Sequence, residues 1–153
     1  MRKILILAVG DLKDSWLKEG CTEFEKRLRP YGDITVREVR ESRLEGARAV
    51  EEEGKALLTL IPPNATVFAL CIEGKPLSSE DFARRIDRAA IEGRGDLCFL
   101  IGGSWGLSSS VKERAQLHLS FSPMTFPHRL ARLMLLEQLY RAFTILAGKP
   151  YHK

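Results

Sequence analysis

Five short apolar segments, each followed by a helix-like pattern, constrain the fold more than any other feature of this sequence. The apolar runs cover residues 4–9, 34–39, 66–72, 97–101 and 117–121. Runs of this length between turn or capping residues are typical of strands. Parallel strands need long crossover connections, which helices usually supply, so the alternation predicts an α/β fold: a mainly parallel sheet with helices on both faces.

The expected helices have recognisable ends. A serine followed three residues later by an acidic residue marks three helix starts, at Ser42, Ser78 and Ser110. Pro127 can open the last helix because its missing N–H is not needed there, and Gly148 ends it. The expected helices cover residues 14–29, 42–60, 78–91, a short stretch after 110, and 127–147, with a turn at residues 74–76.

Length and composition predict one soluble domain over residues 1–153. The apolar start of the chain is only six residues long and lacks a cleavage site, and nothing approaches the roughly 20 apolar residues of a membrane span. We expect a cytoplasmic protein with no membrane contact. The cysteines, Cys21, Cys71 and Cys98, have no metal-ligand spacing, so we expect no metal, with Cys71 and Cys98 as buried thiols in a reducing compartment.

The charge balance is mildly basic. A formal net charge of +4 permits an anionic partner without requiring one. Two groups of arginines are interleaved with acidic residues, and for both we expect a solvated, salt-paired face. They are Arg37, Arg40, Arg43 and Arg48, and Arg84, Arg85 and Arg88.

Two turns near the carboxyl end have the composition of a ligand site. Gly102 and Gly103 open a glycine-rich turn between a strand and a helix, where bare backbone lets a ligand approach, although a turn without a ligand is equally compatible. The turn lacks the Rossmann fingerprint, so a nucleotide site of that kind is disfavoured. Residues 121–126 carry no charge and suit a flat heterocycle between apolar side chains, or a buried connection.

The last helix and the chain terminus carry the remaining candidates. The helix is apolar over more than one stripe, so it lies in the core or packs on a symmetry mate. His128 at its start is either a neutral imidazole available for chemistry or a local packing residue. Arg129 and Arg132, one turn apart, could clamp a phosphate or belong to a surface face. Pro150 stiffens the tail, which ends in Tyr151, His152 and Lys153.

Read in order, five pieces of the final third resemble one family. They are residues 101–106, 120–128, 130–132, 137–142 and 148–153. Together they resemble the SPOUT-class methyltransferases that modify N3 of a pseudouridine in bacterial 23S ribosomal RNA. The resemblance extends over the whole chain, since that family is a bare catalytic domain of about this length. It implies a homodimer, a deep C-terminal trefoil knot, which departs from the usual absence of threading, and the large-subunit RNA or assembled ribosome as partner.

The resemblance also implies site residues. S-adenosyl-L-methionine would be the cofactor, held by Leu70, Gly102, Gly103, Phe121, Ser122, Pro123, Met124, Thr125 and Phe126. Arg132 and the tail, Tyr151 to Lys153, would face the RNA and the reacting base and would meet the cofactor of the opposite protomer. The family often has Asp after the matching leucine, whereas this chain has Cys71, which removes a polar contact there.

The implied chemistry is methyl transfer to an imide nitrogen. His152 or His128 is a candidate proton acceptor, as is water, and Lys153 or Arg132 would stabilise the developing anion. A non-catalytic ribosome- or RNA-binding protein is the alternative function. A hydrolase is disfavoured because the chain has no G-x-S-x-G elbow.

Overall fold

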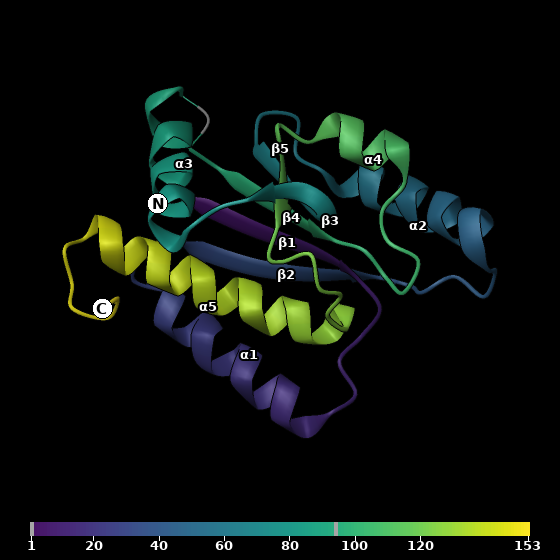
Figure 1. Cartoon of the computed structure of the whole chain (residues 1–153), viewed down its shortest axis with the longest axis horizontal. Helices are drawn as coiled ribbons and strands as arrows, with labels where there is room; N and C mark the ends of the chain where they lie inside the picture. Colours follow the sequence, from purple (N-terminus) through teal and green to yellow (C-terminus); the bar gives the residue numbers. More distant parts are fainter. Residues whose placement is uncertain (1, 94) are drawn as a thin grey trace.

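The computed structural model describes residues 2–93 and 95–153, which contain a five-stranded parallel sheet in the order β2-β1-β4-β3-β5 (Figure 1). The strands are β1 (Lys3–Val9), β2 (Asp33–Val39), β3 (Thr66–Pro76), β4 (Leu97–Ile101) and β5 (Leu117–Ser120). The helices are α1 (Ser15–Leu28), α2 (Gly46–Leu60), α3 (Ser79–Ile91), α4 (Ser109–Arg114) and α5 (His128–Leu146). The predicted α/β class is therefore confirmed.

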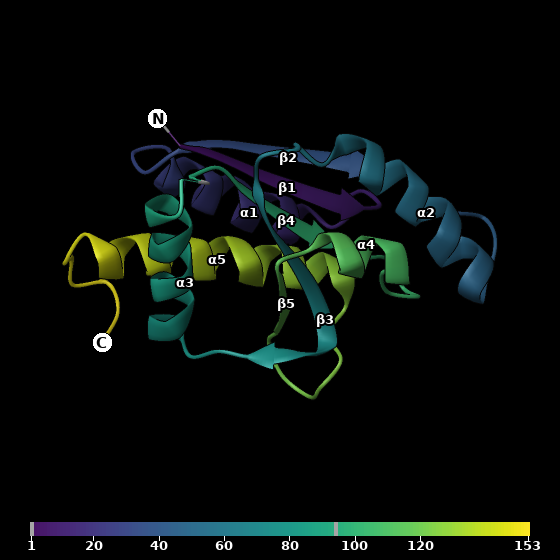
Figure 2. The same cartoon turned by 90° about the horizontal axis from the view of Figure 1, so that it is seen from above.

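Helices cover both faces of the sheet, as predicted (Figure 2). One core lies between the sheet and α1, α3 and α5, and a smaller one lies between the sheet and α2 and α4. β1 supplies both cores by strand alternation, because Ile4 and Ile6 enter the first and Leu7 and Val9 enter the second. A strand buried on both faces reads as a continuous apolar run, which explains the first segment of the sequence.

α5 is sunk in the larger core between α1 and α3. Three of its leucines are fully buried: Leu135, Leu136 and Leu139. The broad apolar surface of the helix is therefore explained by its place in the core, the first of the two expected arrangements. Ala147 ends the helix and Gly148 follows with φ of +68°, the left-handed conformation expected of a glycine at this place. The threading of this third of the chain through a loop stays a prediction.

Three local predictions are wrong. Residues 74–76 are not a turn, because β3 continues to Pro76 and pairs again with β5 after a bulge between Leu70 and Lys75. A Cβ on Gly74 would lie 2.8 Å from the carbonyl of His118, so only glycine lets the two strands approach this closely.

The other two concern helix starts. α2 begins at Gly46, and the Ser42 hydroxyl accepts a hydrogen bond from the Leu44 N–H in the preceding turn instead of capping a helix. α4 is capped by Ser108, whose hydroxyl accepts from the Val111 N–H, and not by Ser110. The prediction for Ser78 is confirmed, since its hydroxyl accepts from the Asp81 N–H at 3.0 Å. Across residues 2–93 and 95–153, none of the helices combines the length and apolar character of a membrane span.

Candidate cofactor pocket and C-terminal tail

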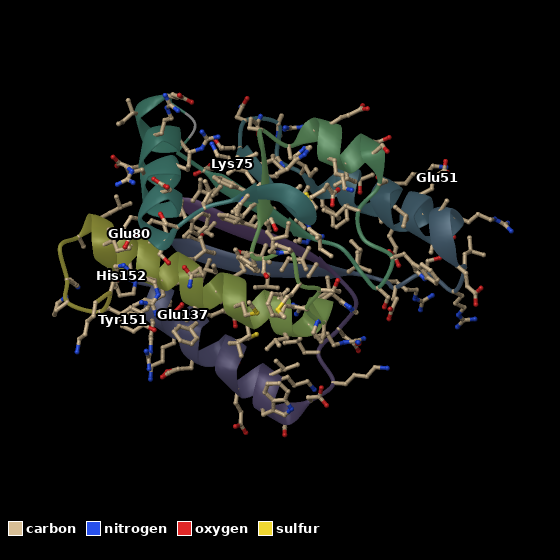
Figure 3. All side chains as sticks on the ribbon, viewed as in Figure 1. Glu51, Lys75, Glu80, Glu137, Tyr151 and His152 are labelled. Carbon is tan, nitrogen blue, oxygen red and sulfur yellow. The ribbon has the colours of Figure 1, made fainter. Side chains whose placement is uncertain are left out.

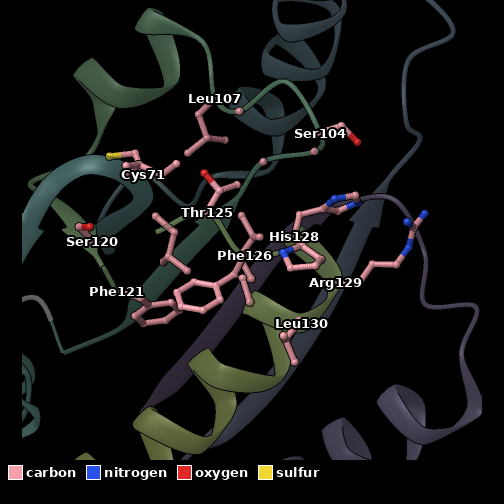
Figure 4. Close-up of a pocket in the computed structure, with 18 of the residues that line it drawn as sticks. Cys71, Ser104, Leu107, Ser120, Phe121, Thr125, Phe126, His128, Arg129 and Leu130 are labelled. Carbon is pink, nitrogen blue, oxygen red and sulfur yellow. The ribbon is translucent and has the colours of Figure 1, made fainter. Parts of the chain in front are cut away.

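A cavity of about 1060 Å³ opens where β4 and β5 end, beside the bulge of β3 (Figure 4). The carboxyl edge of a parallel sheet is where ligands of α/β proteins commonly bind. Eight of the nine residues expected to hold a cofactor line this cavity, and Pro123 lies in the same loop without lining it. The eight are Leu70, Gly102, Gly103, Phe121, Ser122, Met124, Thr125 and Phe126. The structure thus brings three separate segments together around one space.

The glycine turn after β4 is too tight for side chains. A Cβ on Gly102 would lie 2.7 Å from the carbonyl carbon and oxygen of Gly106, and Gly103 pairs with Gly106 in an isolated bridge. Behind the turn, Glu53 of α2 is buried, and a Cβ on Gly103 would lie 3.3 Å from its Oε1. Burial raises the pKa of Glu53, while its Oε2 accepts a hydrogen bond from the Ser42 N–H. The turn therefore exposes backbone to the cavity over a packed support.

Serine hydroxyls shape the loop after β5. Ser120 donates to the carbonyl of Ser122 at 3.1 Å, and the Ser122 hydroxyl accepts from the Met124 N–H at 3.0 Å. The side chains of Phe121 and Phe126 lie on the same side of the cavity in Figure 4. The loop thus supplies apolar surface and backbone groups without a charge, in the manner expected from its composition.

The rim contains residues that sequence reasoning missed. Asp14 and Trp16 come from the start of α1, and Trp16 is 59% exposed. They lie far from the other lining residues in the sequence, so only the tertiary fold reveals their place. Cys71 also lines the cavity and is half-buried, unlike the buried Cys98, so its expected burial is only partly right. Desolvation raises the pKa of Cys71, which keeps it a thiol.

His128 and Arg129 occupy the other side of the rim. The Nε2 of His128 is buried with no hydrogen-bond partner among the described residues and lies 3.5 Å from where a Cβ on Gly10 would be. Burial and the neighbouring Arg129 lower the pKa of His128, so the imidazole is neutral. Arg129 donates from Nε to the Asp11 carbonyl and lies 3.6 Å from a carboxylate oxygen of Glu41.

Arg132 does not line the cavity. Its guanidinium is buried and donates to Glu38 at 2.7 Å and to the Gly10 carbonyl at 2.9 Å. Arg129 and Arg132 are therefore both turned toward the β1–α1 and β2–α2 connections. In the single chain the charges of Arg129 and Arg132 face carboxylates in and beside these two connections and not open solvent.

The C-terminal tail folds back onto α5 and α3 (Figure 3). Tyr151 donates its hydroxyl hydrogen to Glu137 at 3.0 Å, and burial together with this carboxylate raises the pKa of Tyr151. The Nε2 of His152 contacts Glu80, and a hydrogen bond from His152 lowers the pKa of that carboxyl. Arg141 bridges the network, since it binds Glu137 and approaches Nδ1 of His152 at 3.1 Å. Lys153 is exposed at the end.

The pocket and the tail lie at opposite ends of α5. The pocket surrounds the first turn of this helix, whereas the tail follows its last turn. α5 is about 28 Å long, and the tail folds back along its second half, where Tyr151 reaches Glu137, about 14 Å along the axis from the start of the helix. None of the tail residues lines the pocket. The candidate cofactor residues and the candidate tail residues of one chain therefore do not form one site.

The sheet and its pocket define an α/β fold, and the same fold occurs in solved methylase structures. One is a probable methylase family protein from Haemophilus influenzae, with a TM-score of 0.53 and 10% identity over 99% of this chain and 70% of that one. Another is a probable methyltransferase from Bordetella pertussis, with a TM-score of 0.53 and 15% identity over 92% of this chain and 95% of that one. At these identities the likeness concerns the fold alone.

Similarity in sequence identifies the family. A family model described as "Predicted SPOUT methyltransferase" matches residues 2–152, so the chain belongs to the SPOUT methyltransferase family. Two similar proteins are called "Ribosomal RNA large subunit methyltransferase H". That of Carboxydothermus hydrogenoformans is 49% identical over 158 aligned positions, 99% of each chain, and that of Bacillus pumilus is 46% identical over 157, 98% of this chain and 99% of the other. The resemblance seen in the sequence is confirmed, and the protein is a methyltransferase.

Proposed function

We propose that this protein transfers a methyl group from S-adenosylmethionine to N3 of a pseudouridine in large-subunit 23S ribosomal RNA. The observation that carries the proposal is the cavity at the carboxyl edge of the sheet, where the glycine turn and residues 121–126 form a part of the lining that carries no charge. Full-length similarity to proteins named ribosomal RNA large subunit methyltransferases supports the RNA substrate. A non-catalytic RNA-binding protein would have no need of this cavity.

The residues present fit the proposed cofactor. A cavity near 1060 Å³ reaches the upper end of the roughly 300–1,000 Å³ typical of small-molecule sites. Gly102 and Gly103 would leave backbone accessible to the adenosine portion, and Phe121 and Phe126 offer aromatic surface, which attracts cations. When bound, S-adenosylmethionine supplies an electrophilic methyl group on a sulfonium centre. No metal is needed for that transfer, and the described residues contain no group of three or more His, Cys, Asp or Glu placed to hold one.

We propose further that two chains form each active site. Because the tail of a chain is held on Glu137 and Glu80 and does not line the pocket of the same chain, a tail that acts at a pocket would come from a partner chain. Exposed apolar side chains beside the pocket, including Trp16, Trp105 and Met124, provide surface that such a partner could cover. A homodimer would therefore assemble the cofactor residues of one chain with Tyr151, His152 and Lys153 of the other.

Within this site the tail would stabilise the negative charge that develops on the base and would accept the proton from N3. Lys153 is exposed and forms no ion pair among the described residues, so it is available to stabilise the imide anion that develops at N3. Arg132 is already neutralised by Glu38, so its proposed part is to hold the pocket side of α5 and the β2 connection together. His152 is the proposed proton acceptor, oriented by Glu80, and Arg141 must release its Nδ1 for this role.

The test is mass mapping of ribosomal RNA from cells with and without this protein. We expect the deletion strain to lack one methyl group on one pseudouridine, and expression of the protein to restore it. Unchanged RNA mass would refute the function.

The state of the substrate is a separate question. A single domain of net charge +4 has little means of finding one base in free RNA, so we propose that an assembled ribosomal particle is the substrate. Purified protein should methylate ribosomes from the deletion strain much faster than a short oligonucleotide with the same sequence. Equal rates on both would exclude the particle as a requirement.

A further inference from the structure

The end of β2, its connection to α2 and the first turn of α2 carry four arginines. We call residues 37–48 the arginine segment. Its four arginines, Arg37, Arg40, Arg43 and Arg48, are all exposed. Within residues 2–93 and 95–153, none of them forms an ion pair, so the expected salt-paired face is wrong for this group. In the other predicted group, Arg84 and Arg88 do pair, with Asp81 and Glu92.

Two of the three acidic residues of the segment bind arginines of α5. Glu38 lies on the face of β2 that meets α5 and is bound by Arg132 at 2.7 Å. Glu41 lies 3.6 Å from Arg129, also on α5. Strand alternation places Arg37 on the opposite face of β2 from Glu38. Because α5 neutralises two of the three glutamates that alternate with the arginines, the positive charge of the segment is left facing solvent.

The segment is tied to the rim of the pocket. Arg129 lines the pocket and contacts Glu41, while the Ser42 N–H donates to Glu53, which supports the glycine turn. A second hollow of about 410 Å³ lies between Trp105 and the first turn of α2, at Gly46 and Ala47. Trp105 lines both spaces, so the second hollow adjoins the pocket and reaches the segment at Gly46 and Ala47. In Figure 1 the chain enters α2 on the same side of the molecule as the first turn of α5.

We infer that the arginine segment docks the phosphate backbone of the RNA whose target base enters the pocket. Guanidinium groups bind phosphates with paired N–H donors, and freedom from competing carboxylates leaves those donors available. Phosphate contacts fix the position of a nucleic acid without reading its sequence, which suits a surface beside a site that acts on one base. The inference rests on the proposed function.

The experiment compares two triple variants. The first, Arg40→Gln/Arg43→Gln/Arg48→Gln, removes three unpaired arginines, and the control, Arg84→Gln/Arg85→Gln/Arg88→Gln, removes three from α3. Methyl transfer to ribosomes from a deletion strain gives KM and kcat. Fluorescence anisotropy with a labelled single-stranded RNA gives Kd at several salt concentrations. Calorimetry with S-adenosylmethionine shows whether the pocket is intact, and thermal unfolding whether each variant is folded.

We expect the first variant to raise KM and the RNA Kd by about tenfold or more, with kcat and cofactor affinity within twofold of the unmodified protein. The slope of log Kd against log salt should fall by about 2, since each single-strand phosphate contact contributes about 0.7. The control should change KM less than twofold. Unchanged KM and RNA affinity in the first variant overturn the inference.

Two other results are distinguishable. If KM rises but RNA affinity and its salt slope do not change, the segment docks a ribosomal protein and the RNA inference is wrong. If the unmodified protein methylates no RNA at all, the proposed function fails, while the anisotropy comparison still decides whether the segment binds RNA.

Discussion

Gly102 shows how one missing side chain defines the pocket. A Cβ here would lie 2.7 Å from the backbone of Gly106, closer than real Cβ contacts, and backbone cannot move aside as a flexible side chain can. We expect Gly102→Ala to open the turn, to cost about 1–3 kcal/mol of folding free energy through overpacking, and to weaken S-adenosylmethionine binding at least tenfold. Calorimetric titration and urea unfolding measure the two effects.

Gly95 provides the matched control. An added Cβ at this position meets nothing within 4 Å. Gly95→Ala should therefore leave cofactor affinity unchanged and stability within about 0.5 kcal/mol, as for most surface substitutions. Tight cofactor binding by Gly102→Ala would show that the turn is not part of the cofactor site.

His128 links stability to pH. Burial, then Arg129, lowers its pKa in the folded protein, whereas in the unfolded chain the value is near 6.5. Below about pH 6.5 the unfolded chain therefore binds more protons than the folded one, so stability falls as pH falls through this window. The slope stays under the limit of about 1.4 kcal/mol per pH unit for one proton, because the ring is partly exposed.

His128→Gln tests this linkage. Between about pH 7.5 and about pH 5.5, a range above the ordinary carboxylate pKa values, the variant should lose less stability than the unmodified protein. Urea unfolding at each pH supplies the comparison. Parallel curves for the two proteins would mean that the pKa of His128 is the same in the folded and unfolded states, which would contradict the prediction.

Helices and strands were predictable where burial imposes a pattern. The predicted range of β4 matches the observed strand residue for residue, because all five of its residues are buried and a continuous apolar run has clear limits. Helix starts were harder, since the same serine motif occurs at three places and caps a helix at only one of them. At the other two, Glu53 binding Ser42 and the close packing of Gly54 on Ser108 decide the backbone path. Both are tertiary contacts that local sequence does not encode.

A pair of serines tests the observed start of α4. Ser108→Ala removes the hydroxyl that accepts from the Val111 N–H, so we expect a loss of about 1 kcal/mol, as for other N-caps. Ser110 is exposed on the first turn, and Ser110→Ala should stay within about 0.5 kcal/mol of the unmodified protein. Urea unfolding of both variants gives the comparison, and a larger loss for Ser110→Ala would favour Ser110 as the cap.

The arrangement of the whole chain could be foreseen only in part. Composition marked the glycine turn and residues 121–126 as a ligand site, and the fold joins them with Leu70 around one cavity. Composition gave no sign that Asp14 and Trp16 reach the same rim, nor that α5 and α3 hold the tail away from it. Those facts arise from packing between segments that are distant in the sequence. They make catalysis, as proposed here, depend on how two chains assemble.

Complementation between two inactive chains tests that assembly. One chain lacks residues 151–153 and keeps its pocket, and the other carries Gly102→Ala and keeps its tail. If each site combines one pocket with the partner's tail, a mixed dimer has one complete site. Random exchange in an equal mixture should then restore about a quarter of the wild-type sites in a twofold dimer. Methyl transfer is measured for each chain alone and for the mixture after unfolding and refolding together. If the mixture forms mixed dimers but shows no methyl transfer, the tail does not complete the pocket of the partner chain, and the proposed shared site is wrong.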